Sequence, residues 1–154
     1  MPVLQRYHIQ VNSDIYALAK LQEWFNAFKD LLPKTVWMQC NLVLVEIFTN
    51  VVSYAHAGMD EATPIDIELT IHRTENFLEL KIWDFGKPFD LEAQIDRVSA
   101  NTRSYQNIEN IDDIPTGGRG LMISKTIADE IKYETLPDGR NCFVMKKSFA
   151  MPEQ

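Results

Sequence analysis

Residues 64–84 read PIDIELTIHRTENFLELKIWD, two alternating segments joined by a short polar connection. Apolar side chains occupy every second position in both segments. A period of two is typical of strands that face the core on one side and solvent on the other. Because only residues 74–76 separate the segments, we predict an antiparallel hairpin of strands 64–73 and 77–84.

The regions on both sides of this hairpin predict three helices and three further strands. The helices are indicated by apolar stripes and capping residues. They are expected at 12–32 with Asn12 or Ser13 as cap, at 35–56 with Gly58 as a left-handed C-cap, and at 120–130. The strands are expected at 3–11, 131–136 and 141–149, with the turn signal Pro137-Asp138-Gly139 between the last two.

This order of elements, β-α-α-β-β-loop-α-β-β, predicts an α+β fold. Adjacent hairpins favour antiparallel pairing. We therefore expect a two-layer sandwich, with helices on one face of a mostly antiparallel mixed sheet. The chain has 154 residues, a length that suggests one domain over 1–154.

Composition excludes several classes of protein. The formal net charge is −7 and no Lys/Arg cluster occurs, which argues against direct nucleic-acid binding. No stretch of about 18 uninterrupted apolar residues occurs, and the N-terminus lacks the layout of a secretory signal. We therefore expect no membrane span and a cytoplasmic location. Cys40 and Cys142 lie in apolar runs, so we expect buried thiols rather than a disulfide or a metal pair.

The second predicted helix carries Glu46 and Asn50, one turn apart. On a helical wheel it is apolar nearly all round except for the strip that contains them, so we expect both to point into an interior or a cavity. A buried carboxylate needs a partner. That partner is either a structural one, such as backbone or a Lys, or a functional one. In the functional case Asn supplies an oxygen to Mg²⁺ and Glu accepts a proton from an attacking hydroxyl.

The hairpin ends in the sequence Trp83-Asp84-Phe85-Gly86. A carboxylate at this strand end can accept a hydrogen bond from an exocyclic amine, and glycine lets a flat ring approach the backbone. The alternative is an ordinary Asx turn that leaves the strand.

A third motif, Thr116-Gly117-Gly118-Arg119-Gly120, leads directly into the last predicted helix. Glycines at a helix entrance leave backbone N–H groups free to face an anion, and Arg119 adds a mobile positive charge. Tight turns use glycine as well, and the spacing matches neither the dinucleotide fingerprint nor Walker A.

Taken in order, Glu-x-x-x-Asn on a helix, Asp-x-Gly after a strand and Gly-Gly-x-Gly before a helix resemble the three nucleotide-binding boxes of the GHKL ATPase superfamily. The short chain, the D-F-G-K-P-F-D form of the second box and the G-G-R-G-L-M-I form of the third are most similar to the anti-sigma-factor serine/threonine kinases. The resemblance extends from about residue 10 to residue 148 and includes the order of strands and helices.

The resemblance implies roles for individual residues. Asn50 would coordinate the Mg²⁺ that bridges the ATP phosphates, and Glu46 would activate the nucleophile. Asp84 would pair with the adenine amino group, with Gly86 giving room for the ring. The phosphates would be lined by the third box, Gly117, Gly118, Arg119 and Gly120.

The resemblance also implies a lid over ATP at about residues 91–116, with Arg103 or Arg119 reaching the terminal phosphate. One departure concerns the turn after Asn50. Many relatives have His at the position of Tyr54, whereas this chain has His two residues later, at His56.

By resemblance, the chain is expected to be an ATP-dependent serine/threonine protein kinase and an anti-sigma factor. It would phosphorylate an anti-anti-sigma protein of the STAS type, bind a sigma factor and form a homodimer. A second hypothesis is a nucleotide-gated binding module without phosphoryl transfer. A histidine-kinase catalytic domain is disfavoured, because His8, His56 and His72 all lie within the ATP domain itself.

Overall fold

The computed structural model describes residues 4–86 and 119–150, with side chains in the second part described from residue 123 onward. Five strands form one sheet in the order β1-β2-β3-β5-β4, and all four pairings are antiparallel. The strands are β1 (Leu4–Asn12), β2 (Pro64–His72), β3 (Phe77–Asp84), β4 (Glu130–Thr135) and β5 (Asn141–Ser148). The predicted hairpin is therefore present, with Leu69 opposite Leu80.

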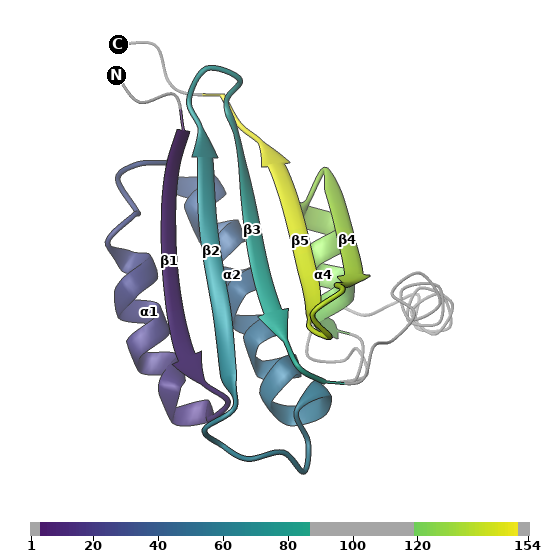
Figure 1. Ribbon diagram of the computed structural model, residues 1–154. Helices are drawn as coiled ribbons and strands as arrows, with labels where there is room; N and C mark the ends of the chain where they lie inside the picture. Colours follow the sequence, from purple (N-terminus) through teal and green to yellow (C-terminus); the bar gives the residue numbers. More distant parts are fainter. Residues whose placement is uncertain (1–3, 87–118, 151–154) are drawn as a thin grey trace, which may run out of the picture.

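Helices cover one face of this sheet, as Figure 1 shows. They are α1 (Leu18–Asn26), α2 (Lys34–Asn50) and α4 (Arg119–Ile127), with short turns η1 (Ile15–Ala17) and η2 (Val51–Ala55). The predicted α+β sandwich with a mostly antiparallel sheet is confirmed. Gly58 and Gly139 both have positive φ, which glycine adopts without strain. The predicted C-cap at Gly58 is wrong, because the helical segment ends at Ala55 with His56 as its C-cap, and Gly58 lies in the turn that follows.

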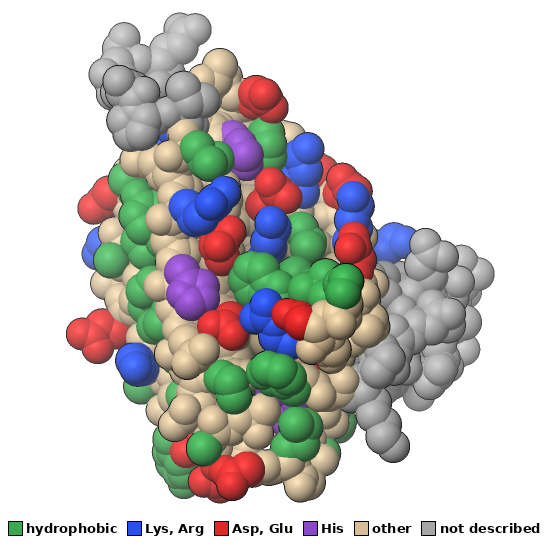
Figure 2. Space-filling model, in the orientation of Figure 1, with side chains coloured by type: hydrophobic (Ala, Val, Ile, Leu, Met, Phe, Trp, Pro, Cys, Tyr) green, Lys and Arg blue, Asp and Glu red, His purple; other side chains and the backbone are tan. Residues whose placement is uncertain are grey.

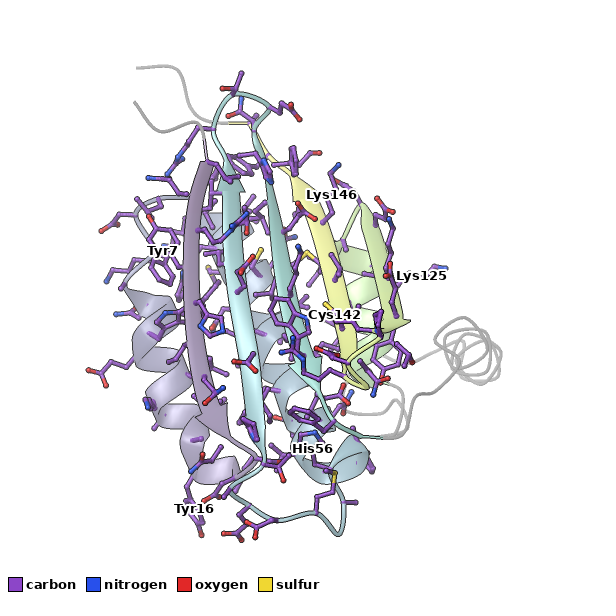
Figure 3. All side chains as sticks on the ribbon, viewed as in Figure 1. Tyr7, Tyr16, His56, Lys125, Cys142 and Lys146 are labelled. Carbon is purple, nitrogen blue, oxygen red and sulfur yellow. The ribbon has the colours of Figure 1, made fainter. Side chains whose placement is uncertain are left out.

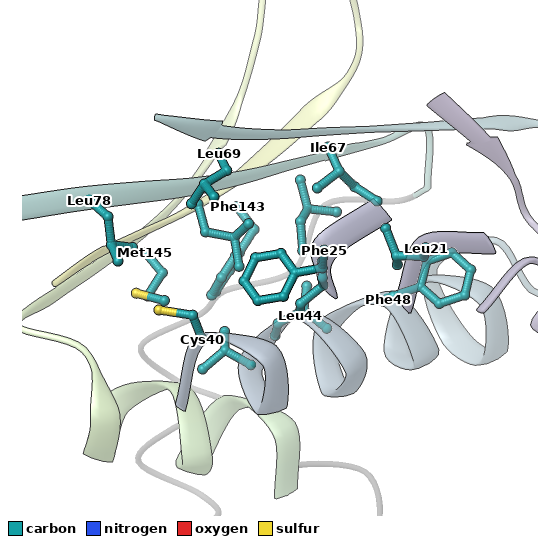
Figure 4. Close-up of a cluster of buried hydrophobic side chains, with 14 of the residues drawn as sticks. Leu21, Phe25, Cys40, Leu44, Phe48, Ile67, Leu69, Leu78, Phe143 and Met145 are labelled. Atoms are coloured by element: carbon teal, nitrogen blue, oxygen red, sulfur yellow. The ribbon is translucent and has the colours of Figure 1, made fainter. Parts of the chain in front are cut away.

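The hydrophobic core lies between α2 and the sheet (Figure 4). Cys40, Leu44 and Phe48 project from α2 at a helical spacing, and none of the three is exposed to solvent. They pack with the inward-facing side chains of the central strands, which include Ile67, Leu69, Leu78, Leu80, Phe143 and Met145. Truncating one such side chain typically costs about 2–5 kcal/mol, so this layer fixes α2 on the sheet.

The first helix is shorter than the predicted 12–32. Strand β1 continues to Asn12, and Asp14 caps η1 by accepting the Tyr16 N–H at 3.0 Å. The expected cap at Asn12 or Ser13 is therefore wrong. At the other end, α1 gives way to tighter turns in which the Phe28 N–H donates to the Phe25 carbonyl. Trp37 Nε1 donates to the same carbonyl at 3.1 Å and helps to end the helix there.

The second helix changes register immediately after Asn50. The α-helical pattern stops there, and Val51–Ala55 form one turn of π-helix, closed by the His56 N–H donating to the Val51 carbonyl at 2.8 Å. The prediction of a single α-helix over 35–56 missed this turn. Wider π turns often occur at functional sites because they re-aim the side chains that follow.

Helix α2 is also less buried than its sequence suggested. Met38 and Leu42 on its outer side are 55% and 42% exposed. Within the described residues, Lys34–Ala55 is long and apolar enough to cross a membrane by length and composition alone. Of the apolar window in this segment, 33% is buried in the structure, and that part includes the side of α2 that packs on the sheet.

The other face of the sheet carries interspersed charges, which Figure 2 shows. His8 lies 3.1 Å from Asp66 and His72 lies 3.2 Å from Glu79, so both are satisfied surface residues. The Arg140 guanidinium lies 5.7 Å from the Trp83 ring centroid. Trp24 and Trp37, on the helical side, pack against the core.

Candidate functional site

The strand end at Asp84 forms the centre of the candidate site. Asp84 is the last residue of β3, lies opposite Asn141 of β5 and is 2% exposed. Its Oδ1 accepts the Gly86 N–H at 2.8 Å and the Asn141 Nδ2–H at 3.0 Å. The Asx turn weighed as the alternative is therefore present, and it holds the carboxylate in one orientation.

The second oxygen of this carboxylate can accept a further hydrogen bond. In the described part of the chain, Asp84 Oδ2 accepts one long hydrogen bond, from the Tyr133 hydroxyl at 3.5 Å. A carboxylate oxygen has two lone pairs, so an additional donor can be accepted. Burial, and then the charge of Asp84, raise the pKa of Tyr133, so its hydroxyl remains a donor.

Asn141 uses all its hydrogen-bonding groups to organise this end of the sheet. Its Nδ2 donates to Asp84 Oδ1 and to the Gly86 carbonyl at 2.7 Å, and its Oδ1 accepts from Thr135 Oγ1 at 3.0 Å. The side chain is completely buried. One amide therefore fixes both the carboxylate and the backbone that leaves β3.

Gly86 lies directly against the end of η2. A Cβ at this position would collide with the backbone of Ala55, whose carbonyl oxygen is its nearest neighbour. A backbone obstacle of this kind cannot rotate away as a side chain can. Glycine is therefore required here because two segments approach closely, and the space beside its Cα is filled by backbone.

His56, labelled in Figure 3, directly follows η2 and bridges two other segments. Its Nε2 lies 2.8 Å from the Phe85 nitrogen and its Nδ1 lies 2.9 Å from Ser13 Oγ. Since the Phe85 N–H is a donor, Nε2 must be the unprotonated acceptor, and Nδ1–H donates to Ser13. Burial lowers the pKa of His56, an effect that the negative charge of Asp84 partly opposes.

Glu46 and Asn50 occupy the last two turns of α2, both partly exposed. They are therefore not part of the closed interior, because the buried side of α2 is formed by apolar residues such as Ile47 and Phe48. The predicted alternative, that both point into a cavity, remains a prediction. Glu46 has an interaction partner in the structure. The two residues remain one helical turn apart and can act on one ligand at the surface of this helix.

The third predicted box is described only at its helical end. Arg119 and Gly120 are the first residues of α4, one residue earlier than the predicted helix start, and α4 packs beside α2. Gly117, Gly118, Arg103 and the predicted lid 91–116 lie outside the described residues. The arrangement thus brings together the first and second boxes, both of which adjoin η2.

The site suits a ligand with an amino-bearing flat ring. Within the described residues, Asp84 Oδ2 accepts a single long hydrogen bond, so this fixed carboxylate can accept a further donor. The Ala55 backbone fills the place of a Gly86 side chain, so this glycine has a packing role rather than making room for the ring. Within 4–86 and 119–150 no cluster of three or more His, Cys, Asp or Glu could hold a metal. A hard cation at Asn50 would therefore need oxygen ligands from a bound substrate in addition to the Asn50 oxygen. Such ligands are typical of Mg²⁺ bound to phosphates.

Comparison with known proteins identifies the family of the chain. Residues 11–147 match the family described as histidine kinase-like ATPase domain. The chain belongs to this family. The predicted resemblance to the GHKL ATPases is thereby confirmed, and the matched range covers most of the chain, including the positions of the three predicted boxes.

Curated relatives of this ATPase domain are named serine-protein kinase RsbW. The relative from Listeria monocytogenes serotype 4a is 31% identical over 91 residues, which are 59% of this chain and 54% of the relative. That from Oceanobacillus iheyensis is 31% identical over 87 residues, which are 56% of this chain and 51% of the relative. The alignments thus span about half the length of these relatives.

Proposed function

We propose that the chain is an ATP-dependent serine/threonine protein kinase that acts as an anti-sigma factor. Its substrate would be an anti-anti-sigma protein of the STAS type, and a sigma factor would be a further partner. The observation that carries the proposal is the buried Asp84 carboxylate, held by Gly86 and Asn141 with an oxygen left to accept another donor. The name of the relatives, serine-protein kinase, supports the reaction class.

Recognition of the base would occur at the end of β3. The adenine amino group is a donor, and Asp84 Oδ2 is an acceptor whose orientation is already fixed. Because Asn141 and Gly86 occupy Oδ1, the binding of a base does not have to reorganise the carboxylate. Pre-organised acceptors of this kind lower the cost of ordering a site on binding.

Phosphate binding would involve the end of α2 and the start of α4. Asn50 would supply one oxygen to Mg²⁺, which neutralises phosphate charge when it is bound. Arg119 and Gly120, with Gly117 and Gly118 before them, would add backbone N–H groups and a positive charge at the N-terminus of α4. The packing of α4 beside α2 supports a shared role for the two helix ends.

Proton transfer would be the task of Glu46. A serine or threonine hydroxyl must lose its proton as it attacks the terminal phosphoryl group, and a carboxylate is a suitable acceptor. Glu46 lies one turn before Asn50 and is partly exposed, so a partner's side chain can approach it. This position favours Glu46 as the proton acceptor for a hydroxyl of an incoming protein.

Mass spectrometry of the partner tests this proposal. The chain is incubated with Mg·ATP and a STAS-domain protein, and the STAS protein is then weighed. We expect a gain of one phosphate on Ser or Thr, which is lost with Glu46→Gln although nucleotide binding persists. Glu23→Gln is a matched control, because Glu23 is an exposed residue of α1. Nucleotide-dependent binding without a gain in mass would instead favour the nucleotide-gated module.

A further inference from the structure

The bridge made by His56 lies outside the three nucleotide-binding boxes. It connects the turn between β1 and η1, the end of η2 and the backbone just after β3 through one imidazole ring. The ring is 3% exposed, so its hydrogen bonds are shielded from water. These segments are far apart in the sequence, since His56 lies 43 positions after Ser13 and 29 positions before Phe85.

The bridge joins the two halves of the proposed nucleotide site. On one side, η2 continues directly from Asn50, which is proposed to act at the phosphates. On the other side, Phe85 lies between Asp84 and Gly86, which are proposed to act at the base. The Ala55 carbonyl packs against Gly86 immediately beside the bridge, so the two halves are in direct contact here.

We propose that His56 is a positioning residue for nucleotide binding, whose neutral ring holds the Phe85–Gly86 backbone at a fixed distance from the helix end that carries Asn50. This inference rests on the proposed function, because it assumes that nucleotide binds between these two elements. His56 itself is not assigned to touch the nucleotide. It acts through the Phe85 N–H and through the close approach of Ala55 and Gly86.

The bridge requires one protonation state of the ring. Nε2 can accept the Phe85 N–H only while it carries no proton. Two groups face the ring from the other segments: the neutral hydroxyl of Ser13, and Asp84 on β3, whose charge favours protonation. Burial outweighs that charge and lowers the pKa of His56 below its ordinary 6.5, so the bridge is intact at neutral pH.

Protonation in acid would therefore weaken nucleotide binding. As the pH falls through the lowered pKa, Nε2 gains a proton and two N–H groups face each other. If the protonated form does not bind, affinity falls by up to about tenfold per pH unit below that pKa. Above the ordinary pKa of histidine the affinity is independent of this group.

The experiment measures the Kd for Mg·ADP by calorimetry from about pH 8 to about pH 5.5. His56→Gln places a carbonyl oxygen near the position of Nε2 and cannot titrate in this range. His56→Leu fills similar space without an acceptor. We expect His56→Gln to bind within about threefold of wild type at pH 8 and His56→Leu to bind about tenfold more weakly, the effect of one unpaired backbone N–H.

The pH profile distinguishes positioning from a merely structural role. The ratio of the Kd of wild type to that of His56→Gln should rise in acid, and titration of ADP itself cancels in this ratio. His8→Gln and His72→Gln are matched controls, because both residues lie on the open face of the sheet. Ser13→Ala, a milder change, should weaken binding a few-fold and keep the pH dependence.

Two results would overturn the inference in different ways. Wild-type affinity and an unchanged pH profile in folded His56→Gln and His56→Leu would refute the role of His56 and leave the proposed function intact. Failure of the wild-type protein to bind Mg·ADP at any pH would refute the proposed function and this inference with it. Nitrogen NMR of the ring at pH ~8 adds a separate check: a proton on Nε2 would contradict the bridge itself.

Discussion

Replacement of Asp84 by Asn is expected to separate nucleotide affinity from folding. In the wild-type protein Oδ1 accepts from Gly86 and Asn141, while Oδ2 faces the Tyr133 hydroxyl. The Asn side chain can keep the first two hydrogen bonds with its own Oδ1. Its Nδ2 would point where Oδ2 was and could donate to the Tyr133 oxygen. The fold should therefore survive, with a loss of about 1–2 kcal/mol from the weaker, uncharged hydrogen bonds.

The effect on binding should be larger than the effect on stability. An adenine amino group would lose a charge-assisted hydrogen bond, worth about 1.5–3 kcal/mol, and would meet another donor instead. That energy corresponds to an increase of about 10- to 150-fold in Kd. The affinity for inosine diphosphate, which carries a carbonyl oxygen in place of the amino group, should fall much less. The preference between the two nucleotides therefore shifts toward inosine.

Calorimetric titration of each protein with Mg·ADP and Mg·IDP measures this shift, and thermal unfolding measures the stability of the same samples. Asp30→Asn is the control, because Asp30 is an exposed carboxylate in the turn after α1. A folded Asp84→Asn protein that binds Mg·ADP as tightly as wild type would refute the assignment of Asp84 to the base.

Three further predictions concern other parts of the site and core. Gly86→Ala should lower thermal stability and weaken nucleotide binding together, because the new Cβ would force the Ala55 backbone to move; an unchanged melting temperature would contradict this. Glu46→Gln should bind Mg·ATP normally yet transfer no phosphate to a STAS protein. Burial raises the pKa of Cys40 to about 12 and that of Cys142 to about 11, so both thiols should react with a disulfide reagent at pH ~8 only after unfolding. Rapid reaction of the native protein would contradict the buried positions.

The hairpin at residues 64–84 could be predicted because its two strands alternate strictly and one face is buried. Alternation at a period of two both identifies a strand and fixes which side meets the core. The position of Asp84 at the end of a strand could be predicted as well, since it lies where the alternation stops. The local pattern of apolar and polar residues was sufficient to predict these features, because residues close together in the sequence determine them.

Other features depended on contacts that no local pattern reports. Asn141 lies opposite Asp84 only because β5 pairs with β3, so its role follows from strand order. The sequence predicts Asn12 or Ser13 as a helix cap, but the Ser13 hydroxyl instead accepts the hydrogen bond of His56. The partial exposure of Glu46 was missed because helical periodicity indicates which side of a helix is apolar and not what covers the other sides.

The most direct test of the central claim is to map the binding of Mg·ADP by NMR on the isotope-labelled protein. If adenine binds at the end of β3, the backbone amide signals of Phe85 and Gly86 and the side-chain amide of Asn141 should shift on titration and saturate together. Signals on the open face of the sheet, such as that of His8, should stay in place. An absence of shifts at the end of β3, with or without shifts elsewhere, would contradict the account.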